Sequence, residues 1–245
     1  MYHQYQPGKS QLIFSSFCFG SAVTNVTKRT GYFDDRNGIY FEQTGNGTLN
    51  WVIRSYVTGS AVEAGNRIPQ SQWNVDPCDG TGPSGFNIDM TKTQLVFIDF
   101  QWLGVGKVRC GFVHDGAMVL THEFKHSNNI PTVYMSNPNL PVRCEIRNTG
   151  ATAGGTLQQI CSSVQSEGGY KEVGIDWEIA NTTLRITDKP GGTALPVIAI
   201  RLKNTFGGTQ NRINAVLTNV GLYVETKPVK YTIVKLPNAS SLTIG

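Results

Sequence analysis

Apolar and polar residues alternate along most of the chain. In segment 94–102, the even-numbered positions include Val96, Ile98, Phe100 and Trp102, whereas the polar residue Asp99 is at an odd-numbered position. Successive side chains of a strand point to opposite faces, so this alternation predicts a strand with one buried face. Comparable segments, separated by turns rich in Gly, Pro, Asn and Asp, occupy residues 10–20, 30–43, 49–58, 107–113, 133–135, 141–147, 173–179, 184–187, 196–203, 214–225 and 229–236.

Many short strands at close spacing, with no long amphipathic helix between them, are typical of a sandwich or jelly roll. We therefore expect an all-β fold, an antiparallel β-sandwich that is jelly-roll-like and has long connecting loops. Residues 1–245 are expected to form a single domain, which can itself be one module of a longer chain. Residues 157–164 fit either a helical turn or a strand. The Gly- and Pro-rich loop 73–85 is expected to cross between the sheets, and ligand binding there is the less favoured alternative.

The densest strand signal lies in segment 94–126 and predicts a β-meander. His114-Asp115-Gly116 is expected to form a three-residue hairpin loop, with Gly116 at the position that needs positive φ. The predicted register pairs Phe112 with Met118, Cys110 with Leu120 and Val108 with His122, and it places Lys107 opposite Glu123.

The same segment contains His122-Glu123-Phe124-Lys125-His126, which matches the H-E-x-x-H pattern of zinc peptidases. On a helix the two histidines share one face and bind one ion, with Glu123 as the general base. On a strand they lie about 13 Å apart, at about 3.3 Å per residue, which is too far to share an ion. Because the surrounding sequence favours a strand, a zinc hydrolase is only a remote alternative. We expect no enzyme activity and no catalytic, cofactor or metal site.

The amino-acid composition argues against several other classes of protein. Of the 245 residues, 16% are charged and the net charge is only +4, which indicates a polar but weakly charged surface. Lys227, Lys230 and Lys235 are the nearest approach to a basic cluster, which is too sparse to predict nucleic-acid binding. The five cysteines are scattered and odd in number, so they do not predict a disulfide framework. No segment is apolar over the length of a membrane span, so none is predicted.

Five stretches resemble a recurrent module of virion structural proteins from marine tailed phages and large DNA viruses. They are residues 5–12 (YQPGKSQL), 31–42 (GYFDDRNGIYFE), 97–109 (FIDFQWLGVGKVR), 134–146 (YMSNPNLPVRCEI) and 161–169 (CSSVQSEGG). They occur in the order of that family and span most of the chain. The resemblance implies a β-rich role that is capsid-associated or fibre-like, and it supplies no catalytic motif.

The leading hypothesis is thus a non-enzymatic structural protein of a virus particle: a capsid, capsid-decorating or fibre component, assembled in the host cell. Its expected partners are other copies of itself, with a trimer as one arrangement, and other virion proteins. The alternative is a jelly-roll module that binds host-surface glycans, on which Trp51, Trp73 and Trp102 are candidates for stacking against sugar rings.

Overall fold

The computed structural model describes residues 2–150 and 154–168, together with short stretches between residues 178 and 233. The chain divides into two compact units, Met1–Val173 and Gly174–Gly245. In the second unit the described residues include one hairpin, formed by β11 (Thr205–Phe206) and β12 (Thr209–Gln210). The strands predicted between residues 173 and 236 lie largely outside the described residues. The single domain predicted for residues 1–245 stays a prediction.

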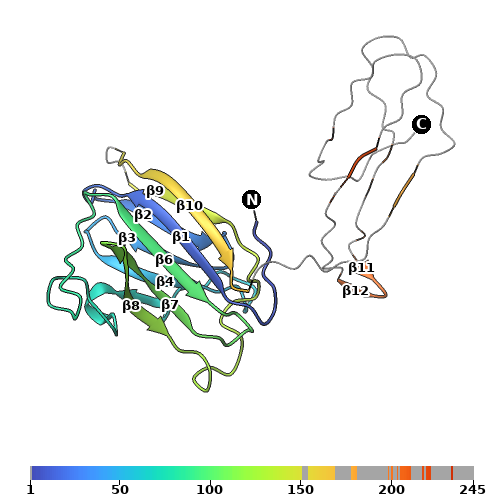
Figure 1. Cartoon of the computed structure of the whole chain (residues 1–245), viewed down its shortest axis with the longest axis horizontal. Coiled ribbons are helices and arrows are strands. Elements are labelled where there is room, and N and C mark those ends of the chain that lie inside the picture. The colour runs from blue at the N-terminus through green and yellow to red at the C-terminus, as the bar shows by residue number, and fades with distance from the viewer. Residues whose placement is uncertain are drawn as a thin grey trace, which may run out of the picture. The chain divides into compact units, whose positions relative to one another are not determined.

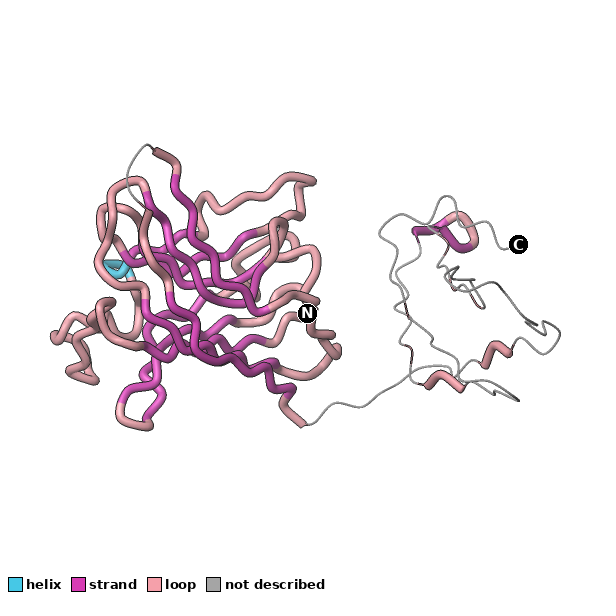
Figure 2. The backbone as a smooth tube through the Cα atoms, turned by 90° about the horizontal axis from the view of Figure 1, so that it is seen from above, coloured by secondary structure: helices cyan, strands magenta, loops and turns pink. Residues whose placement is uncertain are grey.

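The first unit is a sandwich of two antiparallel five-stranded sheets, as Figures 1 and 2 show. The first sheet has the order β10-β1-β6-β7-β8 and the second has the order β5-β4-β3-β2-β9. The first sheet comprises β1 (Gln11–Cys18), β6 (Gln94–Phe100), β7 (Val108–His114), β8 (Ala117–Phe124) and β10 (Gln158–Ser166). The second comprises β2 (Val26–Phe33), β3 (Gly38–Gln43), β4 (Leu49–Arg54), β5 (Arg67–Pro69) and β9 (Val142–Asn148). The predicted all-β, jelly-roll-like sandwich is confirmed, and residues 157–164 belong to a strand.

The core lies between the two sheets and is rich in aromatic rings. Trp51 of β4 is fully buried, and its ring centroid lies 5.1 Å from that of Phe41 and 5.8 Å from that of Phe112 across the sandwich. The indole Nε1–H of Trp51 donates to Thr121 Oγ1 at 2.8 Å, so this buried polar group is satisfied. A second link between the sheets joins the hydroxyls of Ser15 and Thr30, 3.0 Å apart. The strand periodicity that predicted the core is therefore confirmed in β1, β4 and β6.

The predicted β7–β8 hairpin forms, but its register was wrong. The loop has two residues, Asp115 and Gly116, with φ of 48° and 78°, as a type I′ turn requires. A bulge then shifts the strands by one more residue between Cys110 and Gly111. The observed partners are Phe112 with Val119, Gly111 with Leu120, Cys110 with His122, Arg109 with Glu123 and Val108 with Phe124. The predicted Lys107–Glu123 contact is confirmed, at 2.7 Å between Nζ and Oε1.

The long loop after the short 3-10 helix Gln70–Gln72 connects β5 of the second sheet to β6 of the first, as predicted. Its fold depends on Asp76, which is 3% exposed. The Asp76 carboxylate accepts the backbone N–H of Cys78 and that of Ser84, both at 2.8 Å. Gly82 lies so close to Asp76 that a Cβ there would overlap Oδ1. Gly82 thus has a structural role in the loop. Within the described residues, no helix is long and apolar enough to cross a membrane.

Candidate binding face

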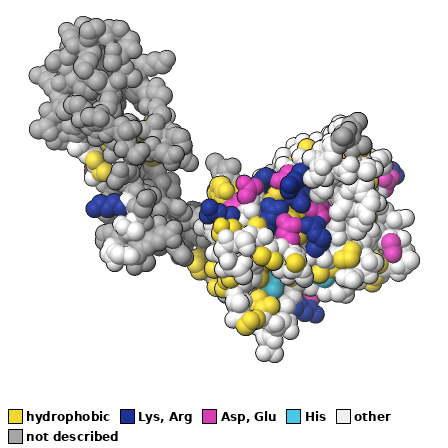
Figure 3. Space-filling view, turned by 180° about the vertical axis from the view of Figure 1, so that it is seen from behind, with side chains coloured by type: hydrophobic (Ala, Val, Ile, Leu, Met, Phe, Trp, Pro, Cys, Tyr) yellow, Lys and Arg dark blue, Asp and Glu magenta, His cyan; other side chains and the backbone are white. Residues whose placement is uncertain are grey.

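Charged side chains cover the outer face of the second sheet. Along β2, β3 and β4 the residues between the core positions would ordinarily face water, yet every residue of β3 and β4 is buried. The reason is that charged side chains from neighbouring strands pack against one another across this face. In the space-filling view, Lys and Arg alternate with Asp and Glu over one region of the sandwich (Figure 3). We call the set Arg29, Asp35, Glu42, Arg54, Glu63, Arg67, Arg143, Glu145 and Arg147 the charged face.

Glu42 of β3 lies at the centre of the charged face, and its side chain is 1% exposed. Its Oε2 accepts Arg29 Nε at 2.8 Å, and its Oε1 is in contact with Arg67 Nη1. Asn50 Nδ2 also donates to Oε1, at 3.4 Å. Cross-strand pairing produces this arrangement, because Arg29 is opposite Glu42 in the β2–β3 register and Asn50 is opposite Glu42 in the β3–β4 register. A buried carboxylate is thereby held between two guanidinium groups.

Glu63 joins the network from the loop between β4 and β5. Its carboxylate accepts Arg54 Nε at 2.8 Å, Arg67 Nη2 at 2.5 Å and the Tyr40 hydroxyl at 2.6 Å. Burial raises the pKa of Glu63, but the hydrogen bonds from Tyr40 and Arg54 outweigh burial and lower it below its ordinary value. Burial also raises the pKa of Tyr40 to about 12. Glu63 is therefore ionised and Tyr40 neutral at physiological pH.

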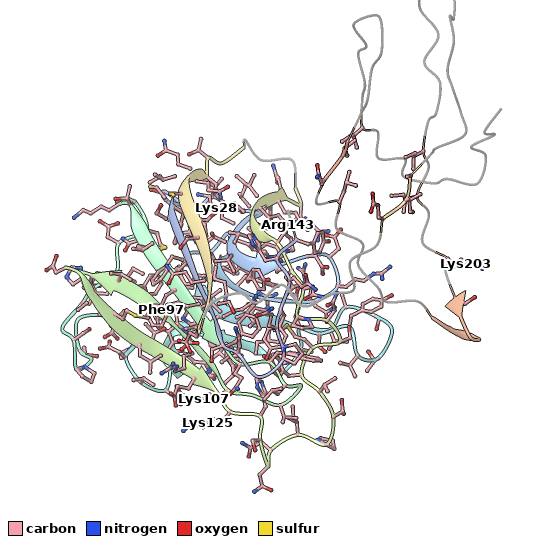
Figure 4. All side chains as sticks on the ribbon, turned by 45° about the vertical axis from the view of Figure 1, so that its right-hand side comes forward. Lys28, Phe97, Lys107, Lys125, Arg143 and Lys203 are labelled. Carbon is pink, nitrogen blue, oxygen red and sulfur yellow. The ribbon has the colours of Figure 1, made fainter. Side chains whose placement is uncertain are left out.

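The other side of the charged face is built on β9, where Figure 4 labels Arg143. Glu145 accepts Arg29 Nη1 at 2.7 Å and Arg143 Nη2 at 2.5 Å, so it connects β2 to β9. Arg143 Nη1 also contacts the carboxylate of Asp35 at 2.6 Å, and that hydrogen bond lowers the pKa of Asp35. Each carboxylate of the charged face thus has at least one arginine partner, and Arg29, Arg67 and Arg143 each have two carboxylate partners.

Aromatic rings form the floor beneath the guanidinium groups. Phe33 and Tyr40 are fully buried, with ring centroids 4.7 Å apart. Arg54 lies over both rings, with Cζ 5.6 Å from the Phe33 centroid and 5.2 Å from the Tyr40 centroid. Gly31 and Gly38 leave room for these rings, because a Cβ at Gly31 would lie 2.8 Å from Tyr40 Cβ and one at Gly38 would overlap Phe33 Cβ. Stacking and ion pairs together restrict the arginine side chains to defined positions.

An open hollow of about 690 Å³ lies on the charged face. Its charged lining residues are Arg29, Arg54, Arg143, Arg147, Asp35, Glu63 and Glu145. Arg147 is exposed, and it forms no ion pair with the residues that the structure describes. The hollow therefore presents a fixed set of donors and acceptors to solvent, together with the Arg147 guanidinium, which has no ion-pair partner among the described residues.

The H-E-x-x-H segment lies elsewhere and does not form the helix that a zinc peptidase needs. His122 and Glu123 belong to β8. The Nδ1 of His122 accepts the backbone N–H of Asn74 at 3.3 Å, and burial lowers the pKa of His122 to about 4. His126 Nδ1 lies 2.7 Å from Gly106 O, and its ring stacks on Tyr134 with centroids 4.1 Å apart.

Glu123, the general base of the zinc alternative, is held by two lysines. Its carboxylate pairs with Lys107 at 2.7 Å and with Lys125 at 3.8 Å, and Figure 4 shows these two lysines at the same end of the sandwich. The hydrogen bond from Lys107 lowers the pKa of Glu123. Among the described residues, no three His, Cys, Asp or Glu side chains are grouped so that they could hold a metal ion. The segment thus has structural contacts that account for each of its polar side chains.

Two of the three tryptophans that were candidates for stacking in the glycan alternative are buried. Trp51 is fully buried and Trp73 is 7% exposed, and both belong to the central core. Trp102 is half-buried against the same core and donates Nε1–H to Met135 O at 3.2 Å. The stacking role predicted for Trp51 and Trp73 is therefore wrong, and that of Trp102 stays a prediction. The sequence showed Arg143, Glu145 and Arg147 on one side of a strand, but their partners became apparent only in the sheet.

Comparisons with known proteins give a distant likeness only. No protein-family model matches the chain, and no curated protein matches it. Among solved structures, chicken galectin 2 has 13% sequence identity and a TM-score of 0.30, over 63% of this chain and 89% of that one. Congerin II with lactose and MES has 11% identity and a TM-score of 0.31, over 65% of this chain and 92% of that one. Ligand-free congerin I has 8% identity and a TM-score of 0.31. The assignment as a β-sandwich rests on the two sheets themselves.

Proposed function

We propose that the first unit is a non-enzymatic binding module whose charged face holds a hydroxyl-rich glycan. The observation that carries this proposal is the hollow of about 690 Å³ lined by four arginines and three carboxylates. Ligand sites typically enclose about 300–1,000 Å³, so the hollow has the size of a site for a short oligosaccharide.

The chemistry of the charged face suits neighbouring hydroxyl groups. A sugar hydroxyl donates to a carboxylate and accepts from a guanidinium, and the charged face offers both within one hollow. Ion pairs already hold Arg29, Arg54 and Arg143 in place, so a ligand need not order them on binding. Arg147, which has no ion-pair partner among the described residues, can offer its donors to the ligand. Binding here relies on charged hydrogen-bonding groups and not on stacking against tryptophan.

A binding experiment with a matched control tests this proposal. A glycan array should identify a ligand, and calorimetry should then show that Arg147→Ala weakens its affinity by about 10-fold or more, since a hydrogen bond to a charged group contributes about 1.5–3 kcal/mol. Lys92→Ala removes the same charge from an exposed position outside the hollow and should leave affinity unchanged. No glycan bound at millimolar concentrations, or equal weakening by both substitutions, would contradict the proposal.

We also propose that the chain belongs to a virus particle, as a capsid, decorating or fibre component that contacts other virion proteins. The resemblance of five stretches to virion modules supports this role. So does the first sheet, whose nine-residue edge strand β10 has no charged residue and therefore suits assembly contacts. Electron microscopy of particles labelled with an antibody to this chain should show particle-bound signal, and unlabelled particles would count against it. A virion component and a glycan-binding module are compatible, because a particle protein can use the charged face on host glycans.

A further inference from the structure

The two sheets have four edge strands, and three of them are protected against pairing with another chain. An unprotected edge presents a row of free N–H and C=O groups, which native proteins normally block. Strand β5 has only three residues and ends in Pro69. Strand β9 has charged side chains at Arg143, Glu145 and Arg147. Short length, proline and charge are all common means of blocking an edge.

Residues 74–76 lie beside strand β8 and form hydrogen bonds with its outer edge. Thr121 O accepts the backbone N–H of Val75 at 3.1 Å and that of Asp76 at 3.2 Å. The Asn74 side chain donates to Glu123 O and accepts Glu123 N–H, both at 2.9 Å. The outward backbone groups of Thr121 and Glu123 are therefore used within the chain.

Strand β10 has none of these protections among the described residues. Its nine residues, Gln158–Ser166, include no charged residue, no proline and no glycine, and most of them are exposed. A bulge disturbs its pairing with β1 near Ile160, but residues 161–166 pair regularly. Within the part of the chain that the structure describes, this stretch is an open edge long enough to accept another strand.

The backbone directions within β10 are set by its pairing with β1. Cys161 N–H donates to Ser16 Oγ at 3.0 Å, and Glu167 N–H donates to Ser10 O at 2.9 Å, so odd-numbered residues face β1. In an antiparallel ladder the alternate residues then direct both backbone groups to the other side. The N–H and C=O groups of Ser162, Val164 and Ser166 therefore point to the open edge.

Side chains on the inner face of β10 indicate which strand fits. The Ser166 hydroxyl is buried and has no hydrogen-bond partner among the described residues. A second β10, antiparallel about an axis at Val164, places its Ser162 directly opposite Ser166, with Cβ atoms about 5 Å apart. It also places Val164 opposite Val164, and Val164 already packs against the core. The sequence from Ser162 to Ser166 thus complements itself.

We propose that two copies of the chain pair through β10, antiparallel about a two-fold axis at Val164, so that the first sheets join. The pairing gives hydrogen-bond partners to the outward backbone groups of Ser162, Val164 and Ser166 in each β10. It involves the first sheet only and is independent of any ligand on the charged face.

Light scattering on the full chain tests the oligomeric state. A dimer is expected at micromolar concentrations. Ser162→Pro removes an N–H that only the second copy uses, so it should weaken dimerisation by at least about 10-fold. The control Ser163→Ala alters a side chain on the outer face and should leave the dimer intact. A monomer, a trimer, or a dimer equally stable in both variants would overturn the proposal, provided that circular dichroism shows both variants folded.

Disulfide trapping tests the register without relying on a proline. In a Cys161→Ser background, Val164→Cys places two thiols on the two-fold axis, where Cα atoms of paired residues lie about 5.5 Å apart. Oxidation should therefore produce a covalent dimer on a non-reducing gel. Gln165→Cys in the same background places its thiol opposite residue 163 and should not produce one. A covalent dimer from the second variant and not the first would contradict the pairing at Val164.

Discussion

Replacing Glu42 by alanine is expected to lower the free energy of unfolding by about 3–5 kcal/mol, because removing one partner of a buried ion pair leaves the others uncompensated. The Glu42 side chain is 1% exposed and is held between Arg29 and Arg67. Arg29 is itself only 11% exposed at its side chain, so it cannot recover full hydration when Glu42 is lost. Urea unfolding of both proteins, followed by circular dichroism, measures the difference.

Asp35→Ala is the matched control for this prediction. Asp35 also pairs with an arginine, Arg143, but its side chain is 86% exposed. Exposed ion pairs contribute about 0–1 kcal/mol, so this substitution should have a small effect. If Glu42→Ala costs no more than Asp35→Ala, the buried network does not stabilise the second sheet as described.

Stability should fall by about 3 kcal/mol between pH 6.5 and pH 4 through His122 alone. Burial lowers the pKa of His122 from 6.5 to about 4, so the folded protein keeps this imidazole neutral. Above pH 6.5 the side chain is neutral in both states and its contribution to stability is complete. As the pH falls from there, the unfolded chain takes up the proton and the folded chain does not. The contribution is therefore lost by about pH 4.

His122→Gln isolates this contribution from other acid effects. The glutamine carbonyl can still accept the Asn74 N–H that His122 accepts, but it does not titrate. Lowered pKa values of carboxyl groups such as Glu63 and Asp76 destabilise both proteins alike at low pH. Urea unfolding at pH 7, 5.5 and 4 should show a steeper loss for the native protein than for His122→Gln. Equal slopes would mean that His122 titrates normally in the fold.

The strands of the first unit were predictable because alternate residues reach the core: burial alternates along β1, and Val96, Ile98 and Phe100 of β6 join the core cluster. The β7–β8 register was not predictable to the residue. It depends on positive φ at both Asp115 and Gly116 and on a bulge, and the bulge places Thr121 where it accepts Trp51 Nε1 and donates to Cys110 O. These contacts come from tertiary packing, which short-range patterns do not contain.

The grouping of charged residues on the charged face could not be predicted from the sequence, for a different reason. Alternation along β9 indicated that Arg143 and Glu145 share a side, but it could not identify Arg29 and Glu42 as their neighbours. Those residues come together because β9, β2 and β3 are adjacent in the sheet, although β9 is far from β2 in the chain. Strand order is a property of the whole fold. The separate strands of the candidate site could therefore be predicted from the sequence, but their assembly into one site could not.

The most direct test of the charged face is NMR mapping with a glycan identified on the array. Backbone amide and arginine Nε–H signals should shift for Arg29, Arg54 and Arg147 as the ligand is added. Arg109, on the outer face of the first sheet, should not shift. Shifts confined to β2, β3, β4 and β9 would support the charged face as the binding surface. Shifts centred on β1, β6 and β7 would contradict it.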